Sequence, residues 1–157
     1  MKYKYLFLIL LSNIAPTFTF AETKSYANFT GHWIATDGKV SSNVGLNSNC
    51  KKVEIIIEQN ENEILTKLYN AECSLYGSKW GLIKQTIRDG KIFEGEDEVG
   101  TITDDTLITV STSGGYQYAY NLKFITLTNG QKILKSYYGT KSFIGAIATE
   151  ANHQLAP

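Results

Sequence analysis

The chain has 157 residues, of which 43% are hydrophobic and 12% aromatic, and its 15 Lys and Arg residues balance 15 Asp and Glu residues. This balanced, moderately hydrophobic composition argues against a strongly basic nucleic-acid-binding protein and against a charge-rich disordered chain. The length is typical of one globular domain.

The first 21 residues have the layout of a cleavable signal peptide. Two lysines precede a short apolar run over 5–11, and Thr19 and Ala21 supply small residues at the minus-three and minus-one positions of a cleavage site after Ala21. A membrane anchor is the alternative, but the run is shorter than the roughly 20 residues of a spanning helix, and Pro16 interrupts its extension. We therefore expect an exported protein, periplasmic or secreted, with no integral membrane segment after cleavage. The mature chain would have 136 residues and a net charge of −2.

From Gly31 onward, apolar residues recur at every second position, in runs separated by Gly, Asn and Asp clusters. These runs predict strands over residues 31–36, 52–59, 63–70, 79–88, 91–99, 106–112, 116–128 and 131–138. A polar loop is expected over 37–49, and residues 142–150 are either a closing strand, which we favour, or a short helix. Asp89-Gly90 and Asn129-Gly130 predict tight hairpin turns.

Strands joined by short turns form a meander, and a meander of eight or nine strands leaves exposed edges unless it closes. The pattern therefore predicts an all-β fold, an antiparallel up-and-down β-barrel of about eight strands. We expect a single barrel domain over 31–150, a loose lead-in over 22–30 and a frayed C-terminal tail over 151–157. Asn28 begins a glycosylation pattern that matters only in a eukaryotic host.

Cys50 and Cys73 are the two cysteines of the chain, and their spacing matches neither a CxxC redox pair nor a four-ligand zinc site. In an exported chain this even pair predicts a structural disulfide. Two free thiols are the alternative, which the signal peptide argues against. The cysteines lie just beyond the open ends of the predicted hairpin of 52–59 and 63–70, where a disulfide would clamp both strands. Closing a loop of this size is worth about 3 kcal/mol.

Gly31-His32-Trp33 opens the first predicted strand. In an exported, meander-patterned chain of this size, this Gly-x-Trp start resembles that of the lipocalin and avidin-like barrels, which are calycin-type folds. The resemblance implies that the glycine lets the backbone bend, that Trp33 plugs the barrel base and that the interior holds a small ligand. The Thr-Asp-Tyr turn of lipocalins and the tryptophan-rich strands of avidins are absent. In these families a basic residue packs over the tryptophan, and in this chain only a lysine such as Lys132 or Lys135 could take that place.

Alternation places every second residue from Tyr116 to Phe124 on one face of the longest predicted strand. If this face points inward, its three phenols line a ligand cavity; if it points outward, it forms an aromatic ridge suited to a protein partner. The third interpretation is ordinary core with hydroxyls at the barrel rim. The candidate ligand-binding residues are Trp33, Trp80, Tyr116, Tyr118, Tyr120 and Phe124.

The sequence has one acidic cluster, made of Glu94, Glu96, Asp97, Glu98, Asp104 and Asp105. Calcium needs several converging oxygens, but the spacing is not that of an EF-hand loop. Alternation also sends Glu94, Glu96 and Glu98 to one strand face and Asp97 to the other. We therefore expect a solvated strand edge.

His32 and His153 are the only imidazoles, one beside Trp33 and one in the predicted tail, so the sequence offers no histidine pair for a metal. His32 with Asp37 could form a general base, but no nucleophile stands at a recognisable spacing, and Ser113 before two glycines is turn chemistry. A net charge of −2 without a basic aromatic stripe argues against nucleic acid. We expect a non-enzymatic protein with no cofactor, no metal site and no nucleic-acid partner.

The leading hypothesis is an exported, disulfide-bonded barrel that holds a small apolar or amphipathic ligand. The alternative is an exported protein-interaction module, for example an inhibitor or a cell-surface factor, that uses the hairpin 113–120 or the loop 37–49. Ser113-Gly114-Gly115-Tyr116 loosely resembles the Ser-Gly-containing loop of small periplasmic lysozyme inhibitors, which are likewise disulfide-bearing β-barrels.

Overall fold

The computed structural model describes residues 25–157, so the predicted signal peptide lies outside the described residues. Twelve strands make up one antiparallel sheet. The strands are β1 (Gly31–Ala35), β2 (Lys39–Ser42), β3 (Asn47–Gln59), β4 (Glu63–Cys73), β5 (Gly77–Trp80), β6 (Ile83–Arg88), β7 (Lys91–Glu94), β8 (Asp97–Ile102), β9 (Thr106–Ser113), β10 (Tyr116–Thr126), β11 (Lys132–Ser142) and β12 (Gly145–Leu155). The described chain contains no helix long and apolar enough to cross a membrane.

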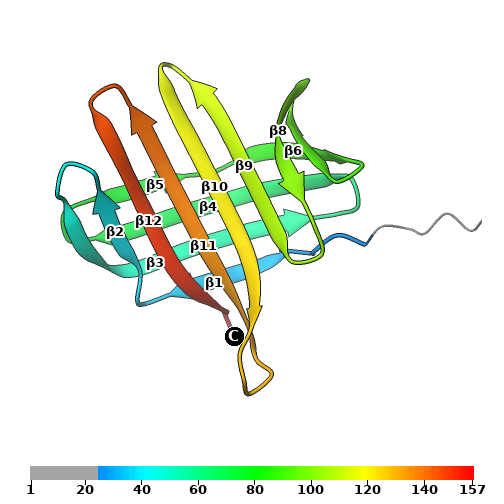
Figure 1. Cartoon of the computed structure of the whole chain (residues 1–157). Helices are drawn as coiled ribbons and strands as arrows, with labels where there is room; N and C mark the ends of the chain where they lie inside the picture. Colours follow the sequence, from blue (N-terminus) through cyan, green and yellow to red (C-terminus); the bar gives the residue numbers. More distant parts are fainter. Residues whose placement is uncertain (1–24) are drawn as a thin grey trace, which may run out of the picture.

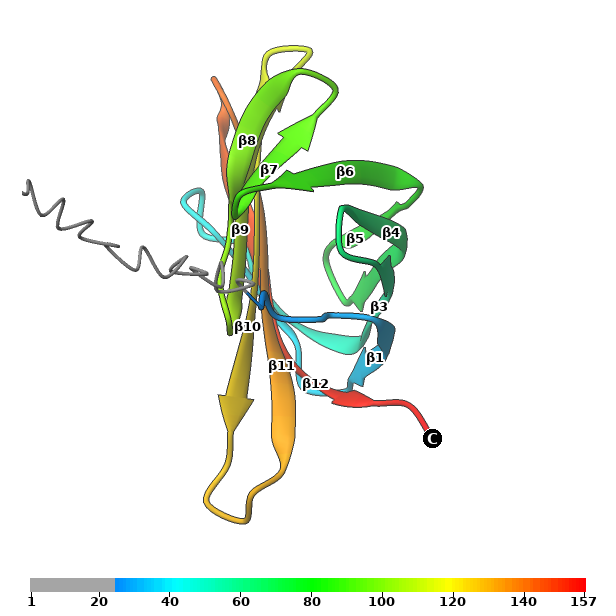
Figure 2. The same cartoon turned by 90° about the vertical axis from the view of Figure 1, so that its right-hand side faces the viewer.

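The sheet closes on itself into a barrel. Ten strands form the ring, in the order β1-β3-β4-β6-β7-β8-β9-β10-β11-β12, and β12 returns to β1 by pairing Leu155 with Trp33 and Gln154 with Ile34. β9 to β12 run across β1, β3 and β4 in Figure 1, and Figure 2 shows these two groups as opposite walls. β2 and β5 lie outside the ring. The predicted fold class is confirmed, with ten strands in the closed wall rather than about eight.

Three predicted segments divide differently in the structure. The loop expected over 37–49 contains β2 and the first residues of β3. The strand expected over 79–88 is two strands, β5 and β6, and the one expected over 91–99 is the β7–β8 hairpin. The breaks occur where Leu82 has a φ of 59° and Gly95 a φ of 64°, since this left-handed backbone conformation ends a strand. Residues 142–150 contribute to a strand, as favoured.

Both ends of the described chain pack against the barrel, where a loose lead-in and a frayed tail were expected. Ala27 and Phe29 are buried, and the Ala27 N–H donates a hydrogen bond to the Thr103 carbonyl over 2.8 Å. At the other end, β12 continues to Leu155 and His153 is fully buried. Thr149, Ala151 and His153 continue the inward face of β12. Two of the three are polar, so the apolar alternation that predicts a strand is not visible there.

The disulfide between Cys50 and Cys73 is confirmed. The two cysteines are register partners in the β3–β4 hairpin, so the bond cross-links neighbouring strands. They lie within the strands rather than beyond their ends, because β3 begins earlier and β4 ends later than the alternating apolar residues indicate.

Candidate functional site

Three aromatic rings fill one end of the barrel interior. Phe29 stacks on Phe124 with ring centroids 4.8 Å apart, and Trp33 lies 5.7 Å from the same ring. The Trp33 indole N–H donates to the Phe29 carbonyl over 3.0 Å. The ammonium group of Lys132 lies 5.9 Å from the Phe124 centroid, so the lysine anticipated over the tryptophan packs over its phenylalanine neighbour instead.

Gly31 has the conformation that this arrangement requires. Its φ is 154°, and a Cβ at this position would lie 2.6 Å from the Leu155 side chain and 2.9 Å from the Trp33 indole nitrogen. A larger residue would therefore displace the closing pair of strands or the tryptophan. The Gly-x-Trp pattern thus has a steric basis in this barrel.

A second aromatic cluster lies farther along the interior, made of Tyr69, Trp80, Tyr120 and Tyr138. Trp80 stacks on Tyr69 at 4.9 Å between centroids, and its ring lies 5.6 Å from Tyr120 and 5.2 Å from Tyr138. Tyr120 and Tyr138 are mostly buried, and Tyr69 is completely so. The rings come from β4, β5, β10 and β11, so the cluster ties the two walls of the barrel together.

Sequence reasoning missed two members of this cluster for different reasons. In β4 the register shifts between Ile57–Thr66 and Ile56–Leu68, which leaves Lys67 as an extra residue and brings Tyr69 to the interior face. Period-two alternation cannot reveal such a bulge. Tyr138 could have been predicted from the sequence, because it lies four positions after Leu134 and therefore on the same face of the strand.

Beyond this cluster the barrel contains a cavity of about 360 Å³. It is lined by Thr66, Trp80, Ile83, Gln85, Glu94, Thr109, Ser111, Ser113, Tyr118, Tyr120 and Tyr138. Thr66, Gln85 and Thr109 are buried, whereas Ile83 and Ser113 are exposed, so the cavity extends from the interior to the surface. Its walls are therefore aromatic rings on one set of strands and hydroxyl or amide groups on another.

Two hydrogen-bonding groups at this cavity have no partner among the described residues. They are the Trp80 indole N–H and the Tyr120 hydroxyl, both shielded from solvent. Burial raises the pKa of Tyr120 well above its ordinary value, and burial also raises the pKa of Tyr138. Both phenols therefore stay protonated at neutral pH and can donate hydrogen bonds to a ligand.

Glu94 departs from the solvated edge expected for the acidic cluster. The β7–β8 hairpin separates it from Glu96 and Glu98, which form ion pairs with Arg88 at 3.6 Å and Lys91 at 2.7 Å. Glu94 instead lines the cavity, where its Oε1 accepts a hydrogen bond from the Gln85 amide over 2.7 Å. The expectation that the three glutamates share one exposed face is wrong because a turn, not a continuous strand, joins them.

The structure divides the six predicted ligand-binding residues among three places. Trp80, Tyr118 and Tyr120 line the cavity. Trp33 and Phe124 belong to the group of three rings that fills one end of the barrel. Tyr116 is 44% exposed at the start of β10, and its ring lies 6.3 Å from Tyr118. The inward direction of the β10 face from 118 to 124 is thus established, while ligand contact at these residues stays a prediction.

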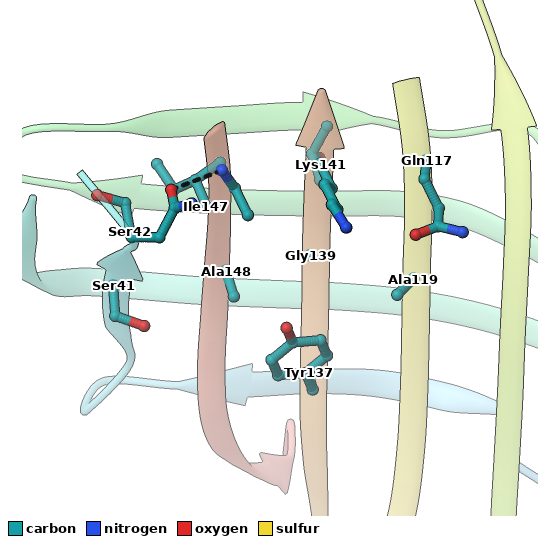
Figure 3. A pocket seen from close by; sticks show the side chains of 12 residues that line it. Ser41, Ser42, Gln117, Ala119, Tyr137, Gly139, Lys141, Ile147 and Ala148 are labelled. Carbon is teal, nitrogen blue, oxygen red and sulfur yellow. Dashed lines mark hydrogen bonds between the residues drawn. The ribbon is translucent and has the colours of Figure 1, made fainter. Parts of the chain in front are cut away.

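A second hollow, of about 290 Å³, lies on the outer surface across β2, β12, β11 and β10 (Figure 3), and we call it the outer groove. Strand register aligns a row of small residues at its floor: Ser41, Ala148, Gly139 and Ala119. Tyr137 and Lys141 stand beside this row in Figure 3. The outer groove joins the segment 37–49 to the hairpin 113–120, the two regions that the protein-interaction hypothesis names.

Within residues 25–157, no group of three or more His, Cys, Asp or Glu side chains is placed to hold a metal ion.

No protein-family model matches the sequence, and no curated protein matches it. The closed antiparallel barrel is compatible with a calycin-like fold. The geometry of the cavity and its lining is therefore the basis for inferring a function.

Proposed function

We propose that this protein is an exported, non-enzymatic binding protein that holds a small apolar or amphipathic ligand in its barrel. The observation that supports the proposal is the interior cavity of about 360 Å³, which combines aromatic walls with a few hydroxyl and amide groups. Small-molecule sites in proteins are typically concave, mostly apolar and supplied with a small number of convergent polar groups. The Cys50–Cys73 disulfide is compatible with an oxidising, exported environment.

The cavity walls are well suited to binding because strands, not loops, position most of them. Thr109 and Tyr120 are register partners on β9 and β10, and Tyr120 faces Tyr138 on β11. Side chains fixed by neighbouring strands lose little freedom when a ligand enters, which lowers the entropic cost of binding. The unpaired Trp80 N–H and Tyr120 hydroxyl would gain hydrogen bonds from a polar group of the ligand.

A titration with N-phenyl-1-naphthylamine, a neutral amphipathic fluorophore, tests this proposal. Ser111 lines the cavity, while its neighbour Thr112 points to solvent. Ser111→Phe would fill part of the cavity, and Thr112→Phe adds the same ring outside it. We expect saturable, one-to-one fluorescence enhancement in the wild type and in Thr112→Phe, and at least about tenfold weaker binding in Ser111→Phe. Equal binding by the two variants, when both are folded by circular dichroism, would refute it.

The outer groove supports a second candidate function, protein interaction. Its row of small residues brings the 37–49 and 113–120 segments to one surface, and Asn43 Oδ1 accepts a hydrogen bond from the Ala146 N–H over 2.8 Å at its edge. Ala119→Arg would obstruct the groove without entering the cavity. A protein captured from the host envelope by the wild type and by Ser111→Phe, but not by Ala119→Arg, would favour this function over ligand binding.

A further inference from the structure

The Glu94 carboxylate is the one charged group among the described residues that line the barrel cavity. We infer that the ligand of this cavity is a small organic cation, an aromatic or alkyl amine that is protonated at neutral pH. This inference builds on the proposed ligand-binding function and specifies the chemical class of the ligand. It rests on two independent features of the lining, the charge of Glu94 and the aromatic walls.

Glu94 lacks the basic partner that other glutamates of this region have. Its neighbours in sequence, Glu96 and Glu98, are paired with Arg88 and Lys91 on the outer surface. Among residues 25–157, no ion pair joins Glu94 to a lysine, arginine or histidine. Its hydrogen bond from the neutral Gln85 amide orients the carboxylate but leaves its negative charge uncompensated.

This uncompensated charge discriminates among ligands. A neutral molecule that fills the cavity displaces water from the Glu94 carboxylate without supplying a positive charge, which is unfavourable. An anionic molecule adds direct repulsion. A protonated amine replaces the lost water with a charge-assisted hydrogen bond, which is about twice as strong as a neutral one. The cavity therefore selects for positive charge.

The aromatic walls favour the same ligand. Trp80, Tyr118, Tyr120 and Tyr138 all line the cavity with Glu94. One face of Trp80 is covered by Tyr69, which stacks on it at 4.9 Å, and this contact holds the indole in place. The electron-rich faces of tryptophan and tyrosine attract cations, and sets of such rings are typical of sites that bind organic ammonium groups.

Tyr120 adds a buried polar group to the same site. Tyr120 is 8% exposed, and its hydroxyl has no hydrogen-bond partner among the described residues. A cavity built only for hydrocarbon would not leave a phenol unsatisfied in its wall, since a buried unpaired polar group is unfavourable. The hydroxyl can accept a hydrogen bond from an ammonium group or donate one to another polar atom of the ligand.

Three probes of similar size and different charge test the inference by isothermal titration calorimetry at neutral pH: 2-phenylethylamine, 2-phenylethanol and phenylacetate. We expect the wild type to bind the amine about tenfold more tightly than the alcohol, and phenylacetate least of all. Glu94→Gln keeps the size of the side chain and its acceptor for Gln85 but removes the charge, so the preference for the amine should disappear. Glu96→Gln, an exposed change in the same hairpin, should retain it.

Equal or tighter binding of the alcohol or phenylacetate would overturn the inference, as would a preference for the amine that survives Glu94→Gln. The comparison of the three probes on the wild type decides this even if Glu94→Gln fails to fold. If the naphthylamine fluorophore still binds and Ser111→Phe still blocks it, the cavity binds ligands and only the choice of a cation is wrong. If neither the fluorophore nor any of the three probes binds, both proposals fail.

Discussion

Acidification should destabilise the barrel through His153, whose side chain is completely buried on β12. Its Nε2 lies 2.7 Å from the Ser136 hydroxyl oxygen on the neighbouring strand. Burial lowers the pKa of His153 to about 4, against weaker opposing effects that include the nearby charge of Asp37. The imidazole therefore remains neutral in the folded protein at pH values where it is protonated in the unfolded chain.

The sign and size of the effect follow from these two pKa values. Because the folded pKa of His153 is below the ordinary value of 6.5, its contribution to stability is present above about pH 6.5 and is lost as the pH falls towards about 4. Between about pH 7 and 5.5, the unfolded state takes up a proton that the folded state does not, which lowers the free energy of unfolding by about 1 kcal/mol. The full loss below about pH 4 is about 3 kcal/mol.

Urea unfolding of a His32→Gln variant measures this contribution, because the variant leaves His153 as the sole imidazole of the chain. We expect its free energy of unfolding to fall by about 1 kcal/mol between about pH 7 and 5.5. In the double variant His32→Gln and His153→Gln, most of this fall should be absent. The same fall in both variants would refute the reasoning, and so would a folded-state titration of His153 by NMR with a midpoint near 6.5.

Three further predictions concern the framework of the barrel. Replacing both Cys50 and Cys73 by alanine should lower the free energy of unfolding by about 3 kcal/mol in urea, and wild type under reducing conditions should show a similar loss. Gly100→Ala should lower the free energy of unfolding by about 1 to 3 kcal/mol, because a Cβ there would lie 1.9 Å from a backbone oxygen of β9. Gly77→Ala is the control, since the nearest atom to a Cβ at Gly77 is 3.5 Å away, and it should leave the stability unchanged. Equal melting temperatures of the two variants would contradict this prediction. Leu82→Gly should raise the melting temperature or leave it unchanged, since it relieves a φ of 59° at an exposed side chain, and a clear decrease would show that Leu82 makes a stabilising contact.

Much of the framework could be predicted from local pattern. The two-residue alternation and the turn dipeptides identified most strands, and the even cysteine pair identified the disulfide. The alternation also grouped Tyr118, Tyr120 and Phe124 on one strand face. These features were accessible because a strand's face, a tight turn and a nearby pairing depend on residues that are close in sequence.

The composition of the barrel interior depended on the tertiary structure. The extra residue in β4 that brings Tyr69 inward, and the turn that separates Glu94 from the exposed glutamates, are consequences of pairing with neighbouring strands. The burial of His153 likewise follows from the pairing of β12 with both β11 and β1. Alternation tells which residues share a face, but only the closed barrel fixes which face is inside and which side chains from distant strands meet there. Local pattern was therefore enough to predict a disulfide-bonded antiparallel barrel, whereas barrel closure brought aromatic rings and the Glu94 carboxylate together around one cavity.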